Sequence, residues 1–175
     1  MKKMILLSVL TASSLMAAKL TVAQGTVQAH TEVFGDSMIN PGTSSITSHL
    51  TMEKDIESIK GSVDIGIAKL KSDNADRDEH MFQALESTKY PAATFTFKKI
   101  AKTSKGYTIS GILDFHGVQK PLIVNADINE NEKSLNIKGK ASFLLSQYNI
   151  KPIKMLFLSV RDKIDLAINI RFRKR

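Results

Sequence analysis

From about residue 20 to its end, this chain alternates apolar and polar residues with a period of two. The clearest stretch is KIDLAINIRFR at 163–173, and GYTISGILDF at 106–115 and SLNIKGKASFLL at 134–145 follow the same pattern. Successive side chains of a β-strand point to opposite faces of the sheet, so each stretch predicts a strand with one apolar and one polar face. A chain of many such strands has to bury all of its apolar faces together.

The alternation and the turn signals between the runs predict eight strands. TSKG at 103–106 and NENEK at 129–133 are typical hairpin connections. Short connections favour an antiparallel meander, and a meander of eight half-buried strands can close into a barrel that has no free edges. The expected strands are 20–34, 45–54, 59–70, 92–102, 106–116, 118–129, 133–147 and 157–173.

One segment, from Asp73 to about Ser87, interrupts the alternation and predicts a helix. Its apolar residues Met81, Phe82 and Leu85 have helical spacing. Asp73 or Asn74 would serve as the N-cap, and the acidic residues that follow suit the positive end of a helix dipole. The predicted fold is therefore all-β, an eight-stranded antiparallel barrel with one helix packed against it.

The first eighteen residues, MKKMILLSVLTASSLMAA, predict a secretory signal peptide. Two lysines precede a short apolar run that ends in small residues. The expected organisation is a signal peptide at 1–18 and one domain at 19–175, in a periplasmic or secreted protein. Loss of the two lysines lowers the formal net charge from +8 to +6, and this basic charge favours transient association with an anionic membrane surface.

The acidic stretch SDNADRDEH at 72–80 suggests a metal loop or catalytic carboxylates, but the spacing excludes the first. Asn74, Asp76 and Asp78 alternate as in a calcium loop, yet Glu79 stands where glycine is required. The four histidines form no zinc-type pair, and the chain has no cysteine. There is also no nucleophile elbow and no glycine-rich phosphate loop. No metal, cofactor or catalytic residue is expected.

The presumed inward face mixes large residues such as Phe95 and Phe143 with small ones such as Gly111 and Gly139. Large and small side chains could interdigitate in a solid core, or they could leave an elongated apolar cavity. Barrels of about eight strands are known with both kinds of interior, so both alternatives remain open at this point.

Two central motifs resemble the YceI family of exported, lipocalin-like β-barrels. The first is N-x-x-R-D-x-H, here Asn74, Arg77, Asp78 and His80, followed by Tyr90-Pro91 and the strand start Thr94-Phe95. The second is the hairpin L-x-x-H-G-V-x-K-P, which covers 113–121. The resemblance extends over most of the chain after the signal, while the opening strands lack the aromatic-rich start of the family.

The resemblance implies binding of an isoprenoid-like or fatty-acyl amphiphile in an apolar tunnel, for carriage or sequestration. The expected partner is a long-chain lipid or isoprenoid, nucleic acid is not expected, and a homodimer is an open alternative. Position in the motifs makes Asn74, Arg77, His116 and Lys120 candidate head-group contacts. The inward apolar residues expected to line the tunnel are Phe95, Phe97, Tyr107, Ile109, Leu113, Phe115, Val124, Ile137, Phe143, Leu166 and Ile168.

Two other functions fit an eight-stranded barrel less well. An enzyme that uses the barrel as a reaction chamber for a lipid-like substrate would need convergent polar groups on the inward face, which here is almost entirely apolar. An outer-membrane barrel would place its apolar face outward between aromatic girdles, whereas this chain has no tryptophan and three tyrosines.

Overall fold

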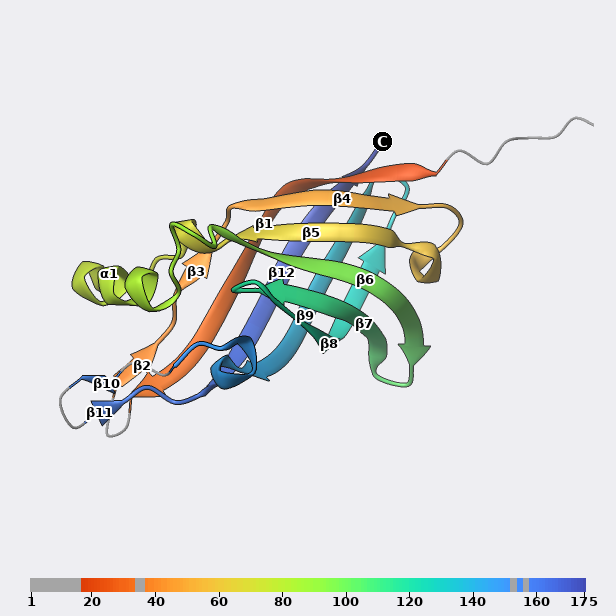
Figure 1. The fold of residues 1–175 in the computed structure, drawn as a ribbon. Coiled ribbons are helices and arrows are strands. Elements are labelled where there is room, and N and C mark those ends of the chain that lie inside the picture. Colours follow the sequence, from red (N-terminus) through yellow and green to blue (C-terminus); the bar gives the residue numbers. More distant parts are fainter. Residues whose placement is uncertain (1–16, 34–36, 152–153, 156–157) are drawn as a thin grey trace, which may run out of the picture.

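A computed structural model describes residues 17–33, 37–151, 154–155 and 158–175, and Figure 1 shows its arrangement. Eight long strands form a closed antiparallel barrel, in which the last strand pairs with both its predecessor and the first strand. The predicted fold is confirmed. The barrel strands are β1 (Ala18–Val33), β4 (Ile46–Met52), β5 (Lys60–Gly66), β6 (Ala92–Thr103), β7 (Gly106–Phe115), β8 (Val118–Glu130), β9 (Ser134–Leu144) and β12 (Lys163–Lys174).

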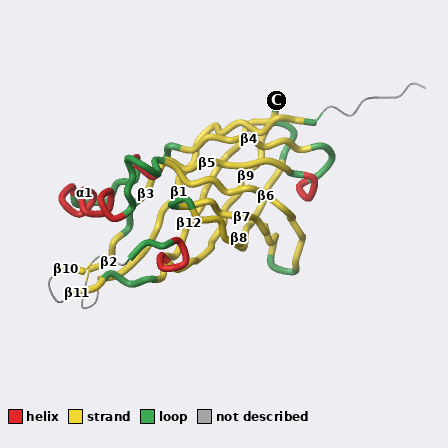
Figure 2. The backbone as a smooth tube through the Cα atoms, in the orientation of Figure 1, coloured by secondary structure: helices red, strands yellow, loops and turns green. Residues whose placement is uncertain are grey.

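Shorter elements gather at the two ends of the barrel, as the backbone trace in Figure 2 shows. Helix α1 (Ala75–Ala84) and the strand pairs beside it lie at one end, and the 3₁₀ helix η1 (Ile56–Ser58) lies at the other. The remaining short elements are β2 (Ser37–Ile39), β3 (Gly42–Thr43), η2 (Ile67–Lys69), η3 (Leu145–Tyr148), β10 (Lys154–Met155) and β11 (Leu158–Ser159).

Three of the expected strands end or begin differently from the prediction. The strand expected at 59–70 ends at Gly66 and the one at 133–147 ends at Leu144, each followed by a 3₁₀ turn. The strand expected at 157–173 is divided into β11 and β12. These turns bend the chain inward over the barrel end, so that Ile67, Leu145 and Tyr148 are buried there. The apolar residues of these turns extend the alternating pattern of the sequence beyond the end of the strand, and the predicted strands are therefore too long.

Two β-bulges correct the alternation where the sequence pattern is irregular. In β6 the register shifts between Phe97 and Lys99, so Phe95 and Ile100 both face the interior although an even number of residues, four, lies between them. In β1 a shift between Val22 and Gln24 does the same for Leu20 and Val27. The inserted residue explains why the alternation in the first strand is less clear than in the last.

The half of the barrel nearest η1 is a solid hydrophobic core. Leu20, Leu50, Leu135 and Phe172 are at most 1% exposed there. Small residues make room for large ones in this region: a Cβ added at Gly139 would lie 2.7 Å from Cγ1 of Val124. One of the two interiors left open by the sequence, interdigitated packing, is therefore realised in this half.

The described part of the chain contains no helix that is long and apolar enough to cross a bilayer. The predicted signal peptide at 1–18 lies outside the described residues except for its last two, and β1 begins at Ala18.

Candidate binding cavity under helix α1

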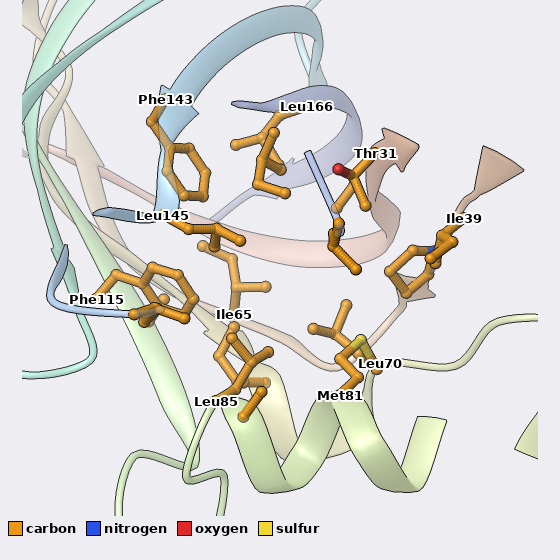
Figure 3. Close-up of a pocket in the computed structure, with 18 of the residues that line it drawn as sticks. Thr31, Ile39, Ile65, Leu70, Met81, Leu85, Phe115, Phe143, Leu145 and Leu166 are labelled. Atoms are coloured by element: carbon orange, nitrogen blue, oxygen red, sulfur yellow. The ribbon is translucent and has the colours of Figure 1, made fainter. Parts of the chain in front are cut away.

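A cavity of about 200 Å³ lies between α1 and the adjacent end of the barrel (Figure 3). Met81 and Leu85 point from the helix toward the barrel, and Phe143 and Leu166 face them from β9 and β12. The second interior left open by the sequence, an apolar cavity, is thus realised in this half. The barrel strands contribute Val27, Ala29, Thr31, Ile65, Ala93, Leu113, Phe115, Phe143, Ile164 and Leu166 to the wall.

Side-chain hydrogen bonds fix the start of α1 over the barrel. Asn74 is the N-cap, and its Oδ1 accepts the backbone N–H of Arg77 at 2.9 Å. The carboxylate of Asp78 accepts the backbone N–H of Ser72 through both oxygens, at 2.9 and 3.0 Å. The first turn of the helix is therefore tied to the segment before it, and Asp78 is engaged within the protein although it also borders the cavity.

His116 holds the other end of the helix against the barrel. It lies in the β7–β8 turn with a φ of 53°, and Gly117 follows with a φ of 73°. Its Nδ1 donates to the carbonyl of Tyr148 at 3.1 Å, because a carbonyl can only accept. Its Nε2 lies 2.9 Å from Oε2 of Glu86, and its ring packs on Tyr90 with the centroids 4.4 Å apart. The side chain thus joins three segments of chain and does not border the cavity.

An aromatic cluster stiffens one wall of the cavity. The rings of Phe115, Phe143 and Tyr148 lie with centroids 5.2–5.8 Å apart, in tilted and edge-to-face arrangements. Phe115 and Phe143 border the cavity, and Tyr148 supports them from behind. Burial raises the pKa of the Tyr148 phenol further above neutral pH.

The cavity wall contains four of the eleven apolar residues expected from sequence: Leu113, Phe115, Phe143 and Leu166. The other seven point into the barrel nearer to η1 or at its far end, outside the cavity wall. They are Phe95, Phe97, Tyr107, Ile109, Val124, Ile137 and Ile168.

Of the four polar candidates, Arg77 alone borders the cavity. Asn74 caps the helix, His116 joins chain segments, and Lys120 is exposed on β8. Other wall residues were not expected from the sequence, among them Ile39, Pro41 and Lys151. These lie in a three-residue strand or in connecting loops, where no periodicity marks which side chain faces inward.

The polar atoms at the cavity are concentrated on α1 and the loop after η3. Nη1 of Arg77 lies 3.3 Å from Oδ1 of Asp73, whose side chain is 86% exposed. Lys151 and His80 also border the cavity and are exposed. The carboxylate of Asp78 keeps its charge while it accepts from Ser72, so groups of both signs lie at this rim. Among the described residues, no three histidine, aspartate or glutamate side chains lie close enough together to hold a metal ion.

An ionic network on the outer surface fastens β1 to β12 beside the cavity. Arg161 contacts Glu32 at 3.2 Å and Asp165 at 2.9 Å, and Lys163 lies 2.8 Å from Asp165. The hydrogen bond from Lys163 is the main cause of a lowered Asp165 pKa. The pKa of His30 is raised, first by its hydrogen bond with Asn40 and then by Glu32.

Comparison with protein families finds one match that covers most of the chain. The model of the YceI-like domain matches residues 17–172. Among curated proteins, Protein YceI of Shigella flexneri is 32% identical over 107 residues, which is 57% of this chain and 56% of that protein. A UPF0312 protein of Photorhabdus laumondii is 38% identical over 71 residues, or 39% of this chain and 37% of the relative. The chain thus matches about half or less of the length of these relatives.

Solved structures show the same fold at low sequence identity. BcnA of Burkholderia cenocepacia superposes with a TM-score of 0.73 at 14% identity, over 84% of this chain and 95% of BcnA. The YceI protein of Campylobacter jejuni gives a TM-score of 0.55 at 18% identity, over 100% of this chain and 94% of that protein.

Proposed function

Because this chain belongs to the family of YceI-like domains, we propose that it binds a single-chain amphiphile, with the apolar chain in the cavity under α1. The observation that carries the proposal is the cavity itself, which apolar side chains from six barrel strands and one helix surround. An apolar space of this kind favours a ligand that water solvates poorly.

Desolvation of the chain would supply most of the binding free energy. Each methylene moved out of water contributes about 0.8 kcal/mol before ordering costs, so the gross gain grows with the number of carbons that the cavity takes up.

The polar rim would set the orientation of the ligand. Arg77, Asp78, His80 and Lys151 border the cavity, whereas the remainder of the wall is almost entirely apolar. The head group therefore lies beside the first turn of α1, and Arg77 is its main contact. The other candidates lie elsewhere. Asn74 caps α1, His116 joins segments of chain, and Lys120 is on the outer surface.

We propose binding rather than catalysis, in a periplasmic or secreted setting. Chemistry on a lipid-like substrate would need several free polar groups converging on one point of the cavity. Asp78, the carboxylate at the wall, is instead bound to the backbone of Ser72. The leader-like residues 1–18 support export.

Lipid mass spectrometry after denaturing extraction tests the proposal on protein purified from its own host. Wild-type protein should carry an amphiphile, whereas Ala84→Phe, which fills the cavity from α1, should carry much less. Ala167→Phe adds the same ring at an exposed position on β12 and should retain the wild-type amount. Equal amounts in all three proteins, or none in the wild type, would contradict binding in this cavity.

A further inference from the structure

The cavity ends at one level inside the barrel, and the strand registers show where. On β6, Ala93 borders the cavity and the next inward residue, Phe95, does not. On β7, Leu113 borders it and the next inward residue, Gly111, does not. Phe95 and Leu113 are direct partners in the antiparallel register, so the boundary is continuous from strand to strand.

The neighbouring strands stop at the same depth. Leu166 on β12 and Phe143 on β9 border the cavity, while the next inward residues do not. The same holds for Ile65 on β5. The layer immediately beyond the cavity, which forms its floor, includes Val63, Phe95, Gly111, Ala141 and Ile168.

Phe95 is the largest side chain in this floor, and Gly111 makes room for its ring. A Cβ added at Gly111 would overlap the Phe95 ring and would lie 2.5 Å from the carbonyl oxygen of Thr96. The ring of Phe97 packs edge-on against the ring of Phe95, with the centroids 5.2 Å apart. The ring is 8% exposed, so it fills the barrel centre at the point where the cavity ends.

We propose that Phe95 sets how deep the apolar chain of the ligand can enter the barrel, and thereby the number of carbons that are buried. This inference rests on the proposed function. Longer chains would have to displace the Phe95 ring and then the fully buried residues behind it, such as Ile109.

Isothermal titration calorimetry with straight-chain fatty acids from hexanoate to hexadecanoate, each below its micelle concentration, tests this role. For the wild type, affinity should rise about fourfold per added carbon until the chain reaches the Phe95 ring, and then stop rising. Phe95→Ala removes a benzene-sized ring, so the chain length at which affinity stops rising should increase by roughly three to five carbons.

Two further variants separate the effect on length from a general loss of packing. Phe95→Leu removes less volume and should shift the limit in the same direction by a smaller amount, and it serves if Phe95→Ala does not fold. Phe172→Leu truncates a phenylalanine that is 1% exposed in the solid half, and it should lower stability without moving the limit.

The outcomes distinguish the two proposals. Wild-type protein that binds no fatty acid of any length would overturn the proposed function and the length limit together. Wild-type affinity that rises through to hexadecanoate, or an unchanged limit in both folded Phe95 variants, would overturn the role of Phe95 while leaving the proposed function intact.

Discussion

Arg77 occupies a position where a single charge distinguishes one ligand class from another. Arg77 borders the cavity, and one nitrogen of its guanidinium contacts Asp73. The contact with Asp73 is an exposed ion pair of the kind that contributes little to stability. Arg77 is therefore available to a ligand without loss of the helix that carries it.

Removal of this charge should weaken binding of anionic amphiphiles in particular. We expect Arg77→Ala to lower the affinity for octanoate by about two- to fivefold, as is typical for a partly exposed ion pair, and to leave the affinity for octanol unchanged. Calorimetry with both ligands measures the difference. Lys120→Ala removes the same charge from the outer surface and should bind octanoate as the wild type does. An equal loss for octanol would show that Arg77 acts through packing rather than charge.

His30 should make the stability of the barrel end depend on pH. Its pKa is raised in the folded protein, mainly through Asn40 and Glu32. A raised pKa contributes stability that is fully present below the unfolded value of about 6.5 and is lost as the pH rises through the folded value. The free energy of unfolding in urea should therefore differ less between pH 6 and pH 8 for His30→Gln than for the wild type.

The control for this experiment is His80→Gln, which alters an exposed histidine on α1. This variant should retain the pH dependence of the wild type. If His30→Gln also retains it, the network around Glu32 does not depend on the charge of His30.

Single residues also mark the limit of what the sequence could predict. Alternation correctly placed Phe95, Leu113 and Phe143 on the inward face, because neighbouring strand residues must point oppositely. It could not show which of them border a cavity. That depends on depth along the barrel and on which glycine lies opposite which ring, and both follow from the pairing register.

At the scale of elements, α1 is the part of the cavity wall that is not fixed by the barrel's hydrogen bonds. The helix has ten residues and none of them is fully buried. Short helices depend on their caps and on packing for stability. The Asn74 cap at one end and the His116 contacts with Glu86 at the other therefore determine how firmly the cavity is covered.

Loss of the cap should loosen α1 without unfolding the barrel. Asn74→Ala removes the acceptor for the Arg77 N–H, which typically costs about 1 kcal/mol. Hydrogen exchange of the α1 amides should then accelerate by roughly fivefold. Asn74→Asp keeps a capping oxygen and should exchange at the wild-type rate, while the amides of β8 should be unchanged in both variants. Uniform acceleration throughout the barrel would contradict an independently opening helix.

Elements with long periodic patterns were predictable, and short ones were not. All eight barrel strands and the helix were expected because each has several residues on one face. The sequence did not predict β2 or β3, since two or three residues form no period. It also continued strands through η2 and η3, where Ile67 and Leu145 remain buried although the backbone has turned.

At the scale of the whole molecule, the barrel combines two interiors in one closed sheet. The half near η1 is packed with aliphatic and aromatic side chains, and the half near α1 is hollow. The packed half supplies hydrophobic stability without cysteine, and the hollow half is free to hold a ligand. This division explains why the same alternating sequence was consistent with both a solid core and a cavity.

Binding of an amphiphile in the cavity under α1 is tested directly by NMR titration of methyl groups with octanoate. We expect saturable shifts for Leu85, Leu113 and Leu166, which border the cavity, and none for the solid-half residues Leu20 and Leu135. No saturable shift, or shifts confined to the exposed methyl groups of Ile123 and Leu144 on the outer surface, would contradict it.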